Sequence, residues 1–146
     1  MKHLTITRIA LSIGLLTASL LAVNSSVYAH GDGAPQSVDT TGLEPLGKEW
    51  RATNPYRGNA KAIEIGAKGY NSNCARCHGL DVKSGGMSPD LRALEVSDDA
   101  DAWFLSRVIN GAKRDDRVKM PPFDGILNQE AMWAIRTYID SMPDDK

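Results

Sequence analysis

The chain has 146 residues, which is enough for one domain of ordinary size. Its 17 basic and 18 acidic side chains give a formal net charge of −1. This balance argues against nucleic acid as a partner, because nucleic-acid binding calls for a basic surface.

The first 29 residues have the pattern of an export signal. Lys2 and Arg8 give a basic start, residues 9–23 are almost entirely apolar, and Ala29 offers a small residue at the expected cleavage point. The apolar run is shorter than the roughly 20 residues that span a bilayer, and an uncleaved membrane anchor is the alternative. We therefore expect cleavage after Ala29 and a mature periplasmic protein that begins at His30.

Residues 30–57 are predicted to form an extended arm, because four glycines, three prolines and few apolar residues occur there. Trp50 and Tyr56 are expected to pin parts of this arm to the core. The folded domain is predicted to be residues 58–146.

The first helix of this domain is expected to start after Gly58, with Asn59 as its N-cap. Two glycines inside it, Gly66 and Gly69, each weaken a helix by about 1 kcal/mol relative to alanine. Their presence predicts that another helix crosses very close at that point.

Two further helices are expected at about 98–110 and 129–141. Acidic residues in the first turn and Gly111 after the last turn favour the former, and Asn128 is the expected N-cap of the latter.

No segment alternates like a strand, so the predicted fold is all-α, with three main helices and long irregular loops at 79–96 and 112–127. Such a thin core favours a large buried cofactor, and Trp103 and Trp133 are expected in the core or the cofactor pocket.

Two thiols separated by two residues and followed directly by a histidine occur in Cys74-Ala75-Arg76-Cys77-His78. This spacing is typical of covalent attachment of c-type haem. A disulfide here would close a very small loop, and a structural zinc site needs about four ligands, which the sequence does not offer. We therefore predict one haem c attached at Cys74 and Cys77, with His78 as an iron ligand.

A methionine is expected as the sixth iron ligand. Met120 lies in a predicted loop and is followed by two prolines, which stiffen the chain and lower the entropy lost on ligation. The other candidates are Met87, Met132, Met142 and His30. A Met120 that only packs against the haem edge is the alternative. Pro89 offers a rigid carbonyl that is expected to accept a hydrogen bond from His78.

These elements resemble a class I cytochrome c over about residues 60–141. The resemblance rests on the Cys-x-x-Cys-His pentapeptide, on Pro89-Asp90-Leu91 and on Met120-Pro121, which occur in the family's order. It implies a fold wrapped around one covalently bound haem, a monomer, and an electron-transfer protein rather than an enzyme.

A finer resemblance is to the cytochromes c-550, through Asn54-Pro55-Tyr56-Arg57, residues 73–80, Met120-Pro121-Pro122-Phe123 and residues 129–135. It implies a quinoprotein (PQQ) alcohol dehydrogenase as electron donor and a terminal oxidase or another cytochrome as acceptor. The basic residues just before Met120 either rim a docking face for an acidic partner or form a solvated loop; they are Lys113, Arg114, Arg117 and Lys119.

Three other functions stay open at this point. One is a carrier that serves another periplasmic dehydrogenase. A peroxidase-like haem enzyme needs an open sixth site with acid and base groups, and a ligand sensor needs an easily displaced ligand. Resistance to carbon monoxide would separate a tightly Met-ligated carrier from the last two.

Overall fold

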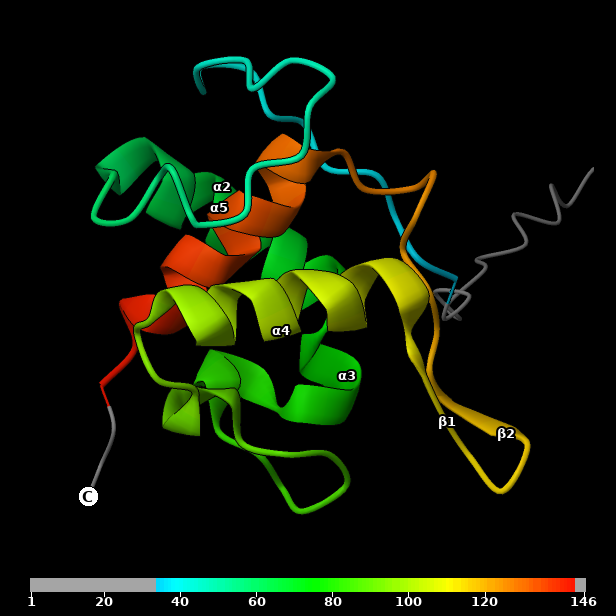
Figure 1. The fold of residues 1–146 in the computed structure, drawn as a ribbon. Coiled ribbons are helices and arrows are strands. Elements are labelled where there is room, and N and C mark those ends of the chain that lie inside the picture. The colour runs from blue at the N-terminus through cyan, green and yellow to red at the C-terminus, as the bar shows by residue number, and fades with distance from the viewer. Residues whose placement is uncertain (1–33, 144–146) are drawn as a thin grey trace, which may run out of the picture. The chain divides into compact units, whose positions relative to one another are not determined.

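The computed structural model describes residues 34–143 (Figure 1). The predicted export signal and the first residues of the predicted arm lie outside this part. The helices and strands that the model describes, in chain order, are α2 (Ala60–Asn73), α3 (Ala75–His78), the 3₁₀ turns η1 (Leu80–Val82) and η2 (Leu91–Ala93), α4 (Asp98–Asn110), β1 (Ala112–Arg114), β2 (Arg117–Met120) and α5 (Gln129–Asp140). No helix in the described range is long and apolar enough to cross a membrane.

The three main helices lie where the sequence predicts them, because each begins at a side chain that caps its first N–H groups. Asn59 accepts from Lys61 and Ala62 at the start of α2, and Asn128 accepts from Ala131 at the start of α5. In α4 the corresponding cap is Ser97, which the sequence analysis did not single out.

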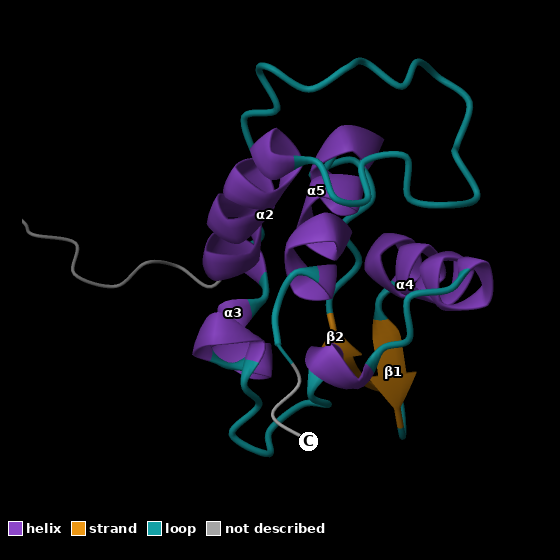
Figure 2. Cartoon of the chain, turned by 90° about the vertical axis from the view of Figure 1, so that its left-hand side faces the viewer, coloured by secondary structure: helices purple, strands orange, loops and turns teal. Residues whose placement is uncertain are grey.

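Helices α2 and α5 cross in close contact, as Figure 2 shows, and this contact is the centre of the core. A Cβ atom on Gly66 would lie 1.9 Å from the carbonyl oxygen of Ala134, so only glycine permits this approach. The rings of Tyr70 and Tyr138 lie beside the crossing with centroids 5.4 Å apart. The close crossing predicted from the two glycines is confirmed.

Residues 34–57 pack along α5. The Gln129 side chain donates to the Gly47 carbonyl at 2.9 Å, and the Glu130 carboxylate accepts from the Leu46 N–H at 2.8 Å. Residues 34–57 cover α5 together with α2 and α4, and every residue of α5 from Ala131 to Ile139 is therefore buried. Of the two aromatic residues expected to pin the arm, Tyr56 is buried, whereas Trp50 is half exposed.

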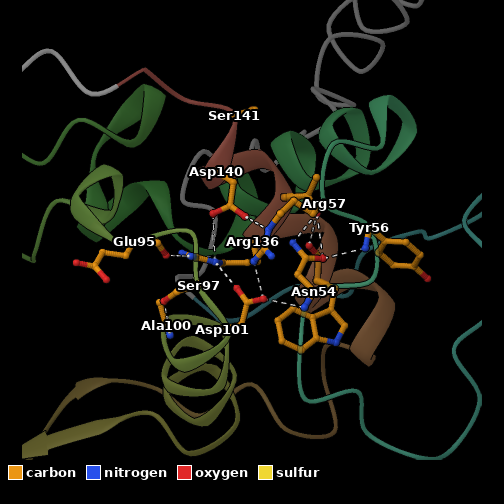
Figure 3. Close-up of polar contacts among 12 residues, drawn as sticks. Asn54, Tyr56, Arg57, Glu95, Ser97, Ala100, Asp101, Arg136, Asp140 and Ser141 are labelled. Carbon is orange, nitrogen blue, oxygen red and sulfur yellow. Dashed lines mark hydrogen bonds and ion pairs between the residues drawn. The ribbon is translucent and has the colours of Figure 1, made fainter.

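A buried ionic cluster joins this arm to α4 and α5 (Figure 3). Arg136 and Asp101 are both fully buried, and their side chains lie 3.1 Å apart. Asp101 also accepts from Arg57 at 2.7 Å and from the Asn54 N–H at 2.8 Å. Asp140 completes the cluster 3.2 Å from Arg136, and burial raises the pKa of its carboxyl.

The expectation of no strand is wrong for residues 112–120. Strands β1 and β2 form an antiparallel hairpin in which Arg114 pairs with Arg117. Asp115 and Asp116 form the two-residue turn with φ of 51° and 57°, and a type I′ hairpin turn requires positive φ at both positions. Three- and four-residue strands are too short to show a clear alternation, and Asp-Asp is a weak turn signal compared with Asn-Gly.

The two tryptophans expected in the core have different environments. Trp133 is fully buried, although its indole N–H has no hydrogen-bond partner within the described residues. Trp103 is 47% exposed, so it does not lie in the protein core, and its place in the cofactor pocket stays a prediction. The Arg107 guanidinium lies over its ring, 5.4 Å from the centroid.

Candidate functional site

Cys77 and His78 of the predicted attachment motif lie on α3, and Cys74 is the single residue between α2 and α3. The Cys74 N–H continues the α2 ladder to the Tyr70 carbonyl at 2.7 Å, and the His78 N–H donates to the Cys74 carbonyl at 2.9 Å. Both cysteines are free thiols. Loss of hydration raises the pKa of the Cys74 thiol to about 12, so this sulfur is protonated near neutral pH.

The His78 ring is oriented by one contact. Its Nδ1 lies 2.9 Å from the Pro89 carbonyl oxygen, as the sequence analysis expected. A carbonyl oxygen only accepts hydrogen bonds, so Nδ1 is the donor in this contact, and in the neutral imidazole the lone pair then lies on Nε2. The imidazole therefore offers Nε2, and not Nδ1, to a metal ion. That His78 binds iron stays a prediction.

Two further contacts, neither of them predicted from the sequence, hold the segments on either side of this bond. The Tyr70 hydroxyl donates to the Gly79 carbonyl at 2.9 Å, which positions the chain directly after His78. The Asp90 carboxylate accepts from the Arg92 side chain at 2.8 Å and caps η2. The hydrogen bond from Arg92 lowers the pKa of Asp90 to about 2. The sequence signal for this pair was an aspartate directly after Pro89 and two residues before an arginine.

Met120 ends β2 and is half buried against the core. Gly111 brings the start of the hairpin against this point, because a Cβ atom there would lie 2.4 Å from the Met120 carbonyl oxygen. The other methionines in the described range differ in exposure: Met87 is 78% exposed, Met132 is fully buried in α5, and Met142 is half buried. A role for Met120 as a ligand stays a prediction.

The donor set fits a covalently attached haem. Cys74 and Cys77 are free thiols three residues apart in the chain. The Nδ1 of His78 is bonded to a carbonyl, which leaves Nε2 for an iron ion. The core also has apolar side chains at its edge that are only partly covered, among them Leu91, Leu94, Ile109 and Met120. In residues 34–143 no group of three or more His, Cys, Asp or Glu side chains is arranged to hold a metal ion.

Comparison with known proteins gives consistent results. Residues 61–139 match the family model described as cytochrome c oxidase, cbb3-type, subunit III. The chain is 56% identical over 137 residues to cytochrome c550 of Pseudomonas aeruginosa, covering 91% of this chain and 94% of that protein. No solved structure was found to match.

Two enzymes of Pseudomonas putida are similar over part of the chain. Quinohemoprotein alcohol dehydrogenase ADH IIB is 33% identical over 91 residues, and ADH-IIG is 36% identical over 78 residues. The matched regions cover 62% and 53% of this chain but only 13% and 10% of the enzymes. The similarity is therefore confined to one small segment of each dehydrogenase.

Proposed function

Since the chain belongs to the cytochrome c family and is 56% identical to a cytochrome c550, we propose that it carries single electrons in the periplasm. The proposed donor is a quinoprotein (PQQ) alcohol dehydrogenase, and the proposed acceptor is a terminal oxidase or another cytochrome. The observation that supports this most directly is the α3 turn, where two free thiols and an imidazole with an available Nε2 lie together. A bound haem supplies a one-electron iron couple at this point.

The residues of the chain have separate tasks in this proposal. Cys74 and Cys77 retain the haem covalently, and His78 binds its iron through Nε2. Pro89 fixes the imidazole through the hydrogen bond at Nδ1. Loss of such a hydrogen-bond partner of a metal ligand typically lowers metal affinity or activity about 10- to 100-fold. Met120 would bind the iron as its sixth ligand, which would raise the reduction potential relative to a second histidine and exclude other ligands.

The alcohol dehydrogenase partner is supported by the two Pseudomonas putida enzymes. Each is named a quinohemoprotein, and the part that this chain matches is a small fraction of the enzyme. We infer that the matched segment is the haem-bearing part of those enzymes. A separate chain of the same kind would then accept electrons from a quinoprotein that has no such segment.

The donor is tested by stopped-flow reduction of the purified ferric protein with a PQQ alcohol dehydrogenase from the same organism. Rapid reduction that requires alcohol is expected. The control is the same mixture without alcohol. Slow or absent reduction of a protein with a normal haem spectrum would contradict this donor and leave the electron-carrier role intact.

The sixth ligand is tested by Met120→Leu, with Met87→Leu as the matched control because Met87 is 78% exposed. We expect the Met120 variant to have a lower reduction potential and to bind carbon monoxide when reduced, while the Met87 variant behaves like the wild type. Ready carbon monoxide binding by the wild type would instead favour a haem enzyme or ligand sensor.

Export is tested by N-terminal sequencing of the protein isolated from the periplasmic fraction. A first residue of His30 is expected from the pattern of residues 1–29. An intact N-terminus in the membrane fraction would favour the uncleaved anchor.

A further inference from the structure

The hairpin β1–β2 is a strongly basic segment of a slightly acidic chain. It extends away from the helices in Figure 1, and residues 113–119 are all exposed. Four of them are basic, namely Lys113, Arg114, Arg117 and Lys119, whereas the two acidic residues are confined to the turn. The chain as a whole has a formal net charge of −1, so this cationic hairpin is a local excess of positive charge.

The fold gains little from these charges. Arg114 lies directly opposite Arg117 in the strand register, and like charges at such a pair destabilise a hairpin. The ion pair that the structure shows within the hairpin joins Arg114 to Asp115 at 4.0 Å, between side chains that are 82% and 90% exposed. Pairs of this kind contribute almost nothing to stability.

The base of the hairpin is anchored beside the predicted iron ligand. Ala112 pairs with Met120 across the strands, and the Gly111 backbone packs against Met120 and the two prolines that follow. The Phe123 N–H donates to the Val108 carbonyl at 2.9 Å, which ties the following loop to α4. Strand β2 therefore leads from its exposed cations directly to Met120 along a fixed backbone.

We propose that this cationic hairpin is the docking element for an acidic surface on the protein that donates electrons to this cytochrome, an inference that rests on the proposed carrier function. Charge complementarity identifies the partner surface as acidic, and such steering raises association rates by one to three orders of magnitude. Val118, 58% exposed between the cations, provides an apolar contact for the docked state. A partner bound to β2 contacts the residues that directly precede Met120 in the chain.

The test compares Arg114→Gln/Arg117→Gln with the control Lys61→Gln/Lys68→Gln, which removes two positive charges from the exposed face of α2. Three quantities are measured for the haem-loaded proteins: the rate of reduction by the PQQ alcohol dehydrogenase, the affinity for that enzyme by calorimetry, and the rate at which the reduced protein passes one electron to the ferricyanide trianion. Unchanged reduction potentials establish that Met120 is not disturbed.

At an ionic strength of about 10 mM, where the Debye length is about 30 Å, the hairpin variant is expected to lose about tenfold in both rates. Its affinity for the dehydrogenase should fall in parallel, and the differences should vanish near 1 M salt, where the Debye length is about 3 Å. The α2 control should differ from the wild type by less than about twofold, because α2 and the hairpin lie on opposite sides of the view in Figure 1 and the α2 cations therefore do not contact a partner bound to the hairpin.

Equal behaviour of the hairpin and control variants in all three measurements would overturn the docking proposal. If the dehydrogenase fails to reduce even the wild type, the proposed donor is wrong. The ferricyanide rates then still decide the role of the hairpin: a selective loss in the hairpin variant supports it, and an equal loss in both variants overturns it.

Discussion

Helix α5 and the hairpin β1–β2 both contain arginine, but they use its charge in opposite ways. In α5, Arg136 is fully buried between Asp101 and Asp140, and it holds the helix against α4 and the arm. In the hairpin, Arg114 and Arg117 are exposed and lie opposite each other. A charge that is buried and paired determines how the chain packs, whereas an exposed, poorly paired charge is available to a partner molecule.

Replacement of the buried arginine gives the largest expected effect on stability. Arg136→Met leaves Asp101 and Asp140 without their fully buried counter-charge and is expected to lower the free energy of unfolding by about 4 kcal/mol. Urea denaturation followed by circular dichroism measures this, with the exposed Arg107→Met as control. A loss of less than about 1 kcal/mol would contradict the structural role of the cluster.

The same variant predicts a pH effect. Burial already raises the pKa of Asp140 above its unfolded value, and loss of Arg136 raises it further. The native state then binds more protons than the unfolded state, so the stability deficit should shrink as the pH falls from 7 toward 4. A loss of stability that grows on acidification would show that the uncompensated charges of Asp101 and Asp140 are not its cause.

Gly66→Ala is the next largest change, because its Cβ atom would lie 1.9 Å from the Ala134 carbonyl oxygen. Separation of α2 and α5 is expected to lower the free energy of unfolding by about 3 kcal/mol. Gly85→Ala is the control, since nothing lies within 4 Å of its Cβ position. Equal melting temperatures for both variants would mean that the crossing can relax.

Gly111→Ala tests the junction between α4 and the hairpin. Its φ of 68° and a Cβ position 2.4 Å from the Met120 carbonyl oxygen combine strain with a clash, for an expected loss of about 2 kcal/mol. Gly125→Ala is the control, because it has φ of 73° but open space. The Gly111 variant should also alter the haem spectrum, and an altered spectrum in both variants would contradict a local effect on Met120.

The smallest stability effect is expected in the hairpin turn. Asp115→Asn/Asp116→Gly supplies the residues that a type I′ turn prefers and should raise the free energy of unfolding by about 0.5 kcal/mol. It also removes two negative charges, so docking to an acidic partner at low salt should become faster. Asp115→Ala/Asp116→Ala is the control: a similar rate but no gain in stability separates the charge from the backbone preference.

The sequence alone determined the three main helices and the attachment motif, because these depend on short-range patterns. Asn59, Asn128 and Gly111 mark helix ends within a few residues, and the glycine at 66 marks the close crossing with α5. The spacing of Cys74, Cys77 and His78 likewise needs no tertiary information.

Only the tertiary structure decided features that join distant parts of the chain. Asp101 accepts hydrogen bonds from Asn54, Arg57 and Arg136, which are all more than 30 positions away in the sequence. No local sequence pattern distinguishes Asp101 from the exposed aspartates at the start of the same helix. The hairpin was also missed, because short strands form through cross-strand hydrogen bonds and a positive-φ turn rather than through a hydrophobic alternation. Burial and pairing are properties of the assembled chain, and they separate a structural arginine from one that faces a partner.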